Sequence, residues 1–592
     1  MYKAPLDDIA FTLKQVAGLK PAIDAGLLGD LGEDLVDAIL SEAGRFAGEE
    51  VAPLYKVGDE VGAVLKDAEV TMPPGWRDLY RRWVEGGWNG LSGPEEFGGQ
   101  ALPTSVAMAV LEMWNSASMA FGIGPTLTMG AIEALDKHAS QPLKDKYLAK
   151  LVSGEWMATM NLTEPQAGSD LAALRARAER AEGGTYRIFG QKIFITYGEH
   201  DFTDNIVHLV LARLPDAPAG TRGISLFLVP KFMVGDDGAP GARNDVFCSG
   251  IEHKLGIHAS PTCTMIYGDG FGGQTPGAVG WLIGEENKGL ACMFTMMNNA
   301  RLAVGMQGVA VAEAATQKAI AYANERRQGK AAGYDGPGMA PIVHHPDVQR
   351  NLLTMKALTQ AARSIAYNCA HAIDMGRLAA TEAERGHWQA RANLLTPLAK
   401  AFSTDVGVDV ASLGVQVHGG MGFIEETGAA AYLRDARIAP IYEGTNGIQA
   451  IDLVARKLPL EGGEHVHGYI AELKAVADAV RNSNRDGFGR TAERLDDALD
   501  AVSEATRFLQ SATAEGRQDE ALAGATPYLR LISLAAGGAY VAQGALADET
   551  GVRTALCRFF AENLLGETRS LADSVLGGAA SLAAAGQSLI SA

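Results

Sequence analysis

Cysteine is scarce in this chain, and its distribution excludes two common roles. The 592 residues contain five cysteines, widely scattered and without a C-x-x-C pair. An odd, dispersed set fits neither a disulfide framework nor a structural zinc site, and it is typical of proteins in a reducing compartment. We therefore expect free thiols and a cytoplasmic location.

Basic residues are few relative to acidic ones. The chain has 51 Lys and Arg against 70 Asp and Glu, which gives a net charge of −19. Nucleic acids and anionic membranes are bound through a basic field, which this balance does not supply. We expect neither as the main partner, although a local basic pocket for a phosphorylated small molecule remains compatible with the composition.

Segments that direct a chain to or across a membrane are also missing from the sequence pattern. The first residues, MYKAPLDDIAFTLKQ, carry early acids and no apolar segment, so we expect no signal peptide. No run approaches the roughly 20 apolar residues of a membrane span. The sequence thus predicts a soluble protein without a membrane partner.

Two glycine-rich nucleotide-binding motifs and the residue spacing of a metal site are absent from the sequence. No G-x-G-x-x-G opens a helix after a strand, and no G-x-x-x-x-G-K-[ST] occurs, which excludes the usual nicotinamide and nucleoside triphosphate turns. Two histidine pairs, His344–His345 and His465 with His467, lack carboxylate or cysteine partners at ligand spacing. We expect no metal site.

The order of the remaining patterns predicts an α+β protein that is mostly α. Helical spacing dominates the first 157 residues, which we expect to be all helical. Period-two runs such as NIVHLVLARL and GISLFLVPKF then predict strands, with an exposed turn at Met233–Val246. Long helical patterns follow, including Pro346–Arg377 and Thr381–Val417. A chain of this length needs several cores. The expected parts are an N-terminal extension (1–37), an N-terminal α domain (38–157), a middle β domain (158–285), a C-terminal α bundle (286–455) and an additional C-terminal helical domain (456–592).

Two stretches near the strands offer groups that suit a flat, polar ligand. LTEPQAGSD, Leu162 to Asp170, supplies the Thr163 and Ser169 hydroxyls and loop amides for a ring edge or a phosphate. KIFITYG alternates on a strand, so Phe194 and Thr196 are expected on one face, where they would cover a heterocycle. An ordinary turn and an ordinary core strand are the alternatives for each stretch alone.

Two further stretches lie late in the chain. QVHGGMGF, Gln416 to Phe423, ends a long helix with glycines that expose amides to a pyrophosphate or simply cap the helix. RDARIAPIYEGTNGIQ carries Glu443 between apolar residues and Gly444. A poorly solvated carboxylate has a raised pKa and is a stronger base for a carbon acid. A surface turn is the alternative for this stretch alone.

Together, and in this order on a helix–strand–helix frame, the four stretches resemble the acyl-CoA dehydrogenase family over roughly residues 38–455. The additional helical domain, the N-terminus and the segment EHKLGIHASPTCTM are similar to a longer bacterial subgroup of the family, one that includes enzymes acting on 3-methylmercaptopropionyl-CoA. The resemblance implies FAD as cofactor and an acyl-CoA substrate, with electron-transfer flavoprotein as the electron acceptor. It also implies a homodimer or a dimer of dimers.

The resemblance assigns cofactor roles to particular positions. It places Leu162 and Thr163 at the flavin edge and Phe194, where most relatives have Trp, with Thr196 against the ring. Arg326, although it lacks the aromatic residue expected after it, would reach a neighbour's FAD. Gly447 stands where relatives often have an adenine-binding side chain. The complete cofactor set implied by the resemblance is Leu162, Thr163, Ser169, Phe194, Thr196, Arg326, Gln416, Gly419, Gly420 and Thr445.

The resemblance also assigns the catalytic chemistry. Glu443 matches the base that removes the substrate α-proton while FAD accepts the β-hydrogen as hydride. A minority of relatives carry this glutamate on the long helix, where the present chain has Ala300. Ser169, Asn298, Arg301 and Gly444 match substrate-contacting positions, and the family often has Asp in place of Asn298.

Two other functions remain open at this point. An acyl-CoA oxidase would use the same fold with O2 as electron acceptor. A non-catalytic, DNA-associated family member would keep the fold without the reaction, although the acidic charge and the intact Glu443 speak against it.

Overall fold

The computed structural model describes residues 1–590, apart from the side chains of residues 296–298. The chain divides into two compact units. Unit 1 comprises Met1–Ala47, Pro103–Ser116 and Arg301–Ala592, and unit 2 comprises Gly48–Leu102 and Ala117–Ala300. The boundary at Ala300 falls inside one helix, α9 (Gly289–Glu325).

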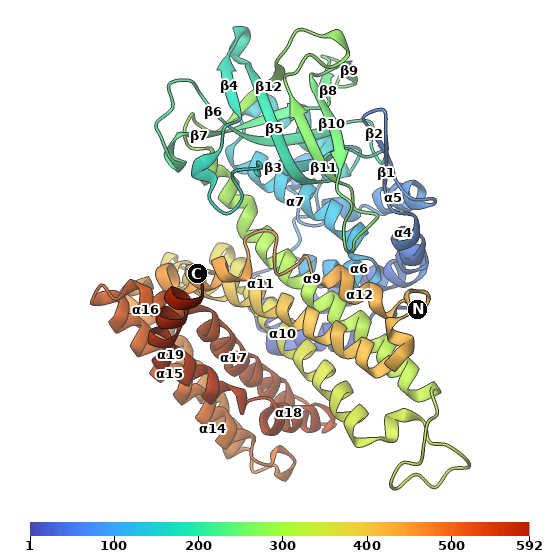
Figure 1. The fold of residues 1–592 in the computed structure, drawn as a ribbon, viewed down its shortest axis with the longest axis vertical. Helices are drawn as coiled ribbons and strands as arrows, with labels where there is room; N and C mark the ends of the chain where they lie inside the picture. The colour runs from blue at the N-terminus through green and yellow to red at the C-terminus, as the bar shows by residue number, and fades with distance from the viewer. Residues whose placement is uncertain (591–592) are drawn as a thin grey trace. The chain divides into compact units, whose positions relative to one another are not determined.

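Unit 2 is built around a sheet whose described part has eight strands (Figure 1). The order is β10-β11-β5-β12-β7-β6-β3, with β4 pairing to β5 and β6. Strands β6 and β7 are almost completely buried, and their sequences are mostly apolar, interrupted by His208 and Arg213 in β6 and by Ser225 in β7. The strands are β3 (Met157–Asn161), β4 (Arg177–Arg180), β5 (Tyr186–Thr196), β6 (Ile206–Arg213), β7 (Ile224–Pro230), β10 (Val246–Ile251), β11 (Thr262–Tyr267) and β12 (Ala278–Ile283).

Two short hairpins in unit 2 correct the sequence-based expectations. The first 157 residues are not all helical, since β1 (Val64–Lys66) pairs with β2 (Glu69–Thr71). The stretch expected as a turn contains β8 (Phe232–Val234) paired with β9 (Pro240–Arg243). Strands of three or four residues are too short to show a period. The helices of unit 2 include α4 (Tyr55–Val61), α5 (Trp76–Glu85), α7 (Met119–His138) and α8 (Gln141–Ser153), and α7 packs on β3.

Unit 1 is centred on long helices that the sequence predicted within one residue at each end. These are α10 (Pro346–Leu378) and α11 (Glu382–His418), which pack along each other. Thr381 separates them as the N-cap of α11. Its hydroxyl accepts from the Glu384 amide while the Glu384 side chain accepts from the Thr381 amide, a complete capping box.

The additional C-terminal helices of unit 1 surround α17 (Ala525–Ala547), which also packs on α10 and α11 (Figure 1). By length and composition α17 qualifies as a membrane span, which corrects the expectation that no segment would, but 83% of its most apolar window is buried. Its neighbours are α14 (Glu464–Asn482), α15 (Thr491–Ala514), α16 (Gln518–Ala523), α18 (Val552–Asn563) and α19 (Glu567–Leu589).

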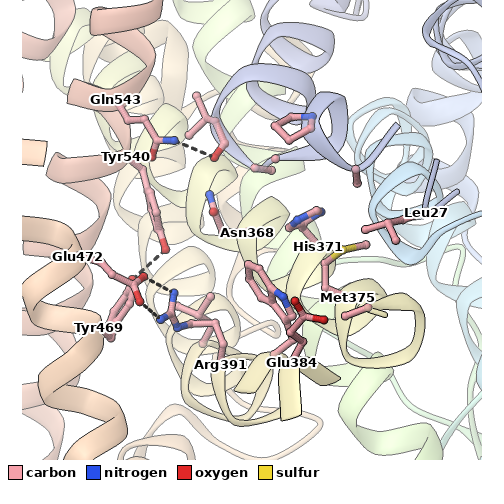
Figure 2. Close-up of a pocket in the computed structure, with 18 of the residues that line it drawn as sticks. Leu27, Asn368, His371, Met375, Glu384, Arg391, Tyr469, Glu472, Tyr540 and Gln543 are labelled. Atoms are coloured by element: carbon pink, nitrogen blue, oxygen red, sulfur yellow. Dashed lines mark hydrogen bonds and ion pairs between the residues drawn. The ribbon is translucent and has the colours of Figure 1, made fainter. Parts of the chain in front are cut away.

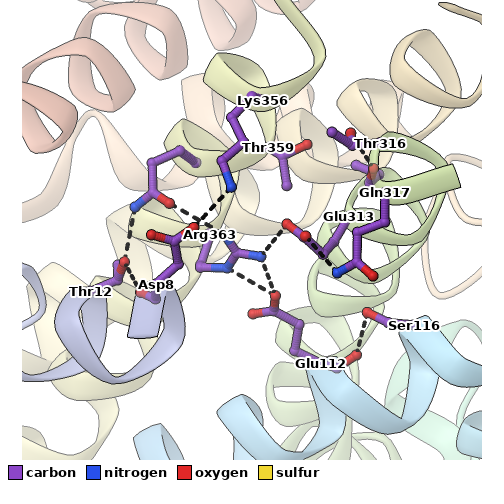
Figure 3. Close-up of polar contacts among 12 residues, drawn as sticks. Asp8, Thr12, Glu112, Ser116, Glu313, Thr316, Gln317, Lys356, Thr359 and Arg363 are labelled. Atoms are coloured by element: carbon purple, nitrogen blue, oxygen red, sulfur yellow. Dashed lines mark hydrogen bonds and ion pairs between the residues drawn. The ribbon is translucent and has the colours of Figure 1, made fainter. Parts of the chain in front are cut away.

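Polar contacts attach the N-terminal extension to this core. The Asp8 carboxylate, on α1 (Leu6–Phe11), accepts from Lys356 of α10 and Arg553 of α18, each at 2.9 Å. Nearby, the buried Arg363 guanidinium is shared by the carboxylates of Glu112, on α6 (Thr104–Ala117), and Glu313 of α9 (Figure 3). Residues from five helices, α1, α6, α9, α10 and α18, thus take part in these contacts. The extension also contains α2 (Leu19–Asp24), whereas α3 (Glu33–Phe46) runs past its expected end at residue 37.

A cavity of about 490 Å³ lies between the extension, α10, α11, α14 and α17 (Figure 2). Its lining includes the neutral imidazole of His371, whose pKa burial lowers to about 4. It also includes the Arg391–Glu472 ion pair. None of the site residues expected from the sequence lines this cavity.

Candidate active site

Glu443 lies in a strained turn between α12 (Ala429–Ala436) and α13 (Asn446–Asp452). Its φ of +53° is in the left-handed region, which a residue with a side chain occupies only when its surroundings enforce it. Gly444 follows with φ +87°, and a Cβ there would lie 2.8 Å from Nε2 of Gln449. Thr445 begins α13 by accepting the Ile448 amide on its hydroxyl. The turn therefore fixes the direction of the Glu443 side chain.

The surroundings of Glu443 combine packing with two cations. Burial raises the pKa of the Glu443 carboxyl, and the charges of Arg301 and Lys400 oppose that rise only in part. Arg301, on α9, is itself buried and pairs with Asp452 of α13 at 3.6 Å. A carboxylate in this setting is a stronger base than an ordinary surface glutamate.

Several buried polar groups beside Glu443 have no partner among the described residues. They are Nε of Arg301, Nε2 of Gln307 and both side-chain polar atoms of Gln449. The other polar atom of Gln307 accepts from the Tyr442 hydroxyl, on the residue before Glu443. Buried polar groups in proteins are normally paired. This cluster consequently fits a polar ligand that completes the hydrogen bonds.

In unit 2, a buried ion pair between Lys192 and Glu164 holds the loop that contains Leu162 and Thr163. Lys192 donates to the Leu162 carbonyl at 3.0 Å and to the Glu164 carboxylate at 2.8 Å. The Glu164 carboxylate also accepts the amides of Arg175 and Ala176. The Thr163 carbonyl accepts from Ile193 of β5. Ser169, at the far end of the loop, is exposed.

Phe194 is presented to solvent by an irregularity in β5. Between Cys263 and Met265 of β11 the register with β5 shifts, and Phe194 has φ +58°. This bulge interrupts the regular alternation expected for the stretch and leaves 58% of the Phe194 side chain exposed. Thr196, two residues on, is half-buried. An exposed aromatic beside a polar loop suits the face of a flat ring.

The remaining cofactor positions lie at exposed helix ends of unit 1. Arg326 follows the last residue of α9, and Gln416 lies in the last turn of α11. Gly419 ends α11 with φ +59°, and Gly420 continues into a short 3-10 turn. Met421, Phe423 and Ile424 of this turn and its C-cap are exposed apolar side chains.

The structure groups the expected residues within each unit. Glu443, Gly444, Thr445 and Arg301 gather in unit 1, with Arg326, Gln416, Gly419 and Gly420 at exposed helix ends of the same unit. Leu162, Thr163, Ser169, Phe194 and Thr196 lie in unit 2. The side chain of Asn298, and those of Met296 and Met297, lie outside the described residues.

Sequence reasoning missed two residues of this site, Lys400 and Asn446. Between Arg391 and Asp405, Lys400 is the only charged residue of α11. A lone charge inside a long apolar run was the available signal.

Comparison with known proteins gives one consistent result. Four family models match: "Acyl-CoA dehydrogenase, N-terminal domain" (34–155), "middle domain" (159–269), "C-terminal domain" (287–458), and "Acetyl-CoA dehydrogenase C-terminal like" (469–585). The chain is 46% identical to a 3-methylmercaptopropionyl-CoA dehydrogenase of Ruegeria pomeroyi, over 93% of this chain and 91% of that protein.

Two solved structures share the fold. One is Caenorhabditis elegans ACDH-11 in complex with C11-CoA, with a TM-score of 0.76, 20% identity, and coverage of 95% of this chain and 92% of that one. The other comes from work on the electron transferring flavoprotein of Acidaminococcus fermentans, with a TM-score of 0.58, 26% identity, and coverage of 73% and 100%. With an aligned relative, matching models along most of the chain and the helix–sheet–helix order, the chain belongs to the acyl-CoA dehydrogenase family.

Proposed function

We propose that the protein dehydrogenates an acyl-CoA thioester to the trans-2-enoyl-CoA with FAD as cofactor and Glu443 as base. The observation that carries this proposal is the Glu443 turn. It holds one carboxylate of raised pKa in a strained backbone, beside Arg301 and unpaired buried polar groups. Ala300, the alternative position for a base, has no group that could accept a proton.

The residues of the site fit FAD. In unit 2, the exposed Phe194 ring and Thr196 would contact the flavin, with the loop of Leu162, Thr163 and Ser169 at its edge. In unit 1, Thr445 is a further expected FAD contact, and Arg326, Gln416, Gly419 and Gly420 would hold the far end of an FAD in a homodimer. When bound, FAD supplies the two-electron acceptor for the β-hydrogen of the substrate.

The chain's own residues handle the proton and the thioester. The Glu443 carboxylate removes the α-proton, which a surface glutamate of ordinary pKa would do less well. Gly444 leaves room for the substrate because it has no Cβ. In unit 1, Arg301 would contact the acyl-CoA and also favours the ionised form of Glu443. Ser169 of unit 2 stays an expected substrate contact.

The substrate we propose is 3-methylmercaptopropionyl-CoA, oxidised to methylthioacryloyl-CoA. The proposal is supported by the relative that bears this name and aligns over 93% of the chain. We propose electron-transfer flavoprotein as the electron acceptor, and a cytoplasmic location in keeping with five free, buried cysteines.

We also propose a homodimer or a dimer of dimers. The exposed apolar side chains of Met421, Phe423 and Ile424 adjoin the glycines expected to reach a neighbour's cofactor. Replacing Phe423 by Asp would place a charge on this surface. We expect smaller particles in sedimentation velocity, and an unchanged particle size would contradict this interface.

The activity is tested by mixing the flavin-loaded protein with 3-methylmercaptopropionyl-CoA without oxygen. Bleaching of the flavin bands is expected, and turnover in Glu443→Gln should fall at least about 100-fold with FAD and thioester binding retained. Glu504→Gln, on the surface of α15, is the matched control. Near-normal turnover in Glu443→Gln would remove this residue as the base, and rapid peroxide formation in air would favour an oxidase.

A further inference from the structure

Hydrogen bonds of Asn446 close the turn that carries Glu443 and attach this turn to α11. The Asn446 amide donates to the Pro440 carbonyl at 3.0 Å, which spans the turn. A left-handed glutamate costs about 1–3 kcal/mol and persists only where neighbouring contacts enforce it. Asn446, three residues after Glu443, supplies those contacts.

The Asn446 side chain is bound to one segment of α11. Its Nδ2 donates to the Ala401 carbonyl at 3.1 Å and to the Asp405 carboxylate at 2.8 Å. Its Oδ1 accepts from Nζ of Lys400 at 2.8 Å and from the Thr404 hydroxyl at 3.3 Å. The amide is thus oriented by a cation on its oxygen and an acid on its nitrogen.

Lys400 occupies an unusual place for a lysine. Its side chain has no solvent exposure. The charged groups that face it are Asp405 of its own helix, Glu443 of the turn and Arg301 of α9. Burial lowers the pKa of the Lys400 ammonium to about 7. A buried charge is costly and is held only where the fold around it compensates.

We propose that Lys400 is a positioning residue for the dehydrogenation: through its hydrogen bond to Asn446 it anchors the turn that carries Glu443, and its positive charge favours the ionised Glu443 carboxylate. The inference rests on the proposed role of Glu443 as base. Two consequences follow. Loss of the anchor displaces Glu443, and loss of the charge makes its carboxyl harder to ionise.

The test uses the full-length, flavin-loaded protein and the variants Lys400→Met, Asn446→Ala and the double variant. Rapid anaerobic mixing with 3-methylmercaptopropionyl-CoA gives the rate of flavin reduction from pH 5.5 to 9. We expect each single variant to lose at least about tenfold in rate, because displacement of a reacting group by a fraction of an ångström is enough. Thioester affinity should change little.

Two measurements distinguish a positioning role of Lys400 from a general structural one: the rate of the double variant, and the pH dependence of flavin reduction in each single variant. If Lys400 acts through Asn446, the double variant should be no slower than about the slower single variant, whereas independent roles would multiply the losses. Removing a cation raises the pKa of a nearby carboxyl, so Lys400→Met should move the acidic limb of the profile to higher pH. Asn446→Ala should leave that limb in place, and Lys400→Arg should restore its position.

Controls keep the outcome decisive. Lys356→Met removes a lysine of α10 whose ion pair is with Asp8 and not with Glu443, Asn446 or Lys400, so this variant should react like the unmodified protein. FAD absorbance and the melting temperature report folding. If Lys400→Met fails to retain FAD, Asn446→Ala carries the rate test. The proposal would be overturned if the single variants reduced flavin within twofold of the rate of the unmodified protein. It would also be overturned if the double variant lost the product of the two single losses, or if Lys400→Met left the acidic limb of the pH profile in place. Failure of the unmodified protein to bleach would instead overturn the proposed function.

Discussion

Replacing Arg363 by Met should destabilise unit 1 strongly. The guanidinium is 1% exposed, and its Nη2 lies 2.6 Å from Glu112 and 2.8 Å from Glu313, whose side chains are 0% and 3% exposed (Figure 3). Removal would leave two buried carboxylates facing an apolar side chain. Breaking a buried ion pair costs about 3–5 kcal/mol, and because two acids lose their partner we expect the upper half of that range.

In a thermal unfolding assay at pH 8, this loss corresponds to a fall of roughly 6 °C in the melting temperature, because the unfolding entropy is about 2.1 cal/mol/K per residue over the whole of unit 1. The fall should depend on pH. Burial alone would raise the pKa of Glu313, but Arg363 and Lys356 hold it below its ordinary value of 4.5. In the native protein the resulting stability is present above pH 4.5 and is lost as the pH falls through the folded-state pKa.

In the Arg363→Met protein, burial without the guanidinium would raise the pKa of Glu313, which would then accept a proton on mild acidification. The difference between the variant and the native protein should therefore be smaller at pH 5.5 than at pH 8. The triple variant Glu112→Gln, Arg363→Met, Glu313→Gln removes the stranded charges and should recover most of the loss. A melting temperature within about 2 °C of the native protein at pH 8 would refute this reasoning.

Three other predictions concern the site. Lys192→Met would release the loop at Leu162 and should weaken FAD binding at least about tenfold by flavin fluorescence, and an unchanged dissociation constant would count against it. Gly444→Ala would place a Cβ against Gln449 at positive φ, so we expect a rate loss of about tenfold with FAD retained, and full activity would show that the turn is pliable. Because burial raises the pKa of Glu443, flavin reduction should show an acidic limb above pH 4.5, and a flat profile down to that pH would contradict the assignment.

The long helices and the central sheet could be predicted from sequence because their patterns extend over many turns. The α10 and α11 boundaries agree within one residue, because the helical spacing continues over many turns in both segments. The β1–β2 and β8–β9 hairpins could not be predicted, since three or four residues around Asp and Gly carry no period. Local patterns fix an element only when they repeat.

The candidate site shows a similar division. Glu443 and its neighbours stand out as a motif, whereas the bulge that exposes Phe194 arises from a register shift with β11 that no local pattern encodes. Lys400 stands out in its helix only as a lone charge among apolar residues, and the partners it meets depend on α9, α11 and α13 packing together. Long-range packing, rather than residue type, determines its role.

The position of α17 has a consequence for how the protein is made. A Cβ at Gly537 would lie 2.8 Å from Cβ of Ala361, so α17 and α10 pack with almost no space between them. On the ribosome α10 begins at Pro346 and α17 at Ala525, which at 5–20 residues per second separates them by roughly 10–40 s of synthesis. During that interval the surface of α10 that packs against α17 in the folded protein has no helix to cover it. A nascent chain of this length therefore presents a chaperone with a defined, transient binding surface, and slow codons before α17 would lengthen its exposure.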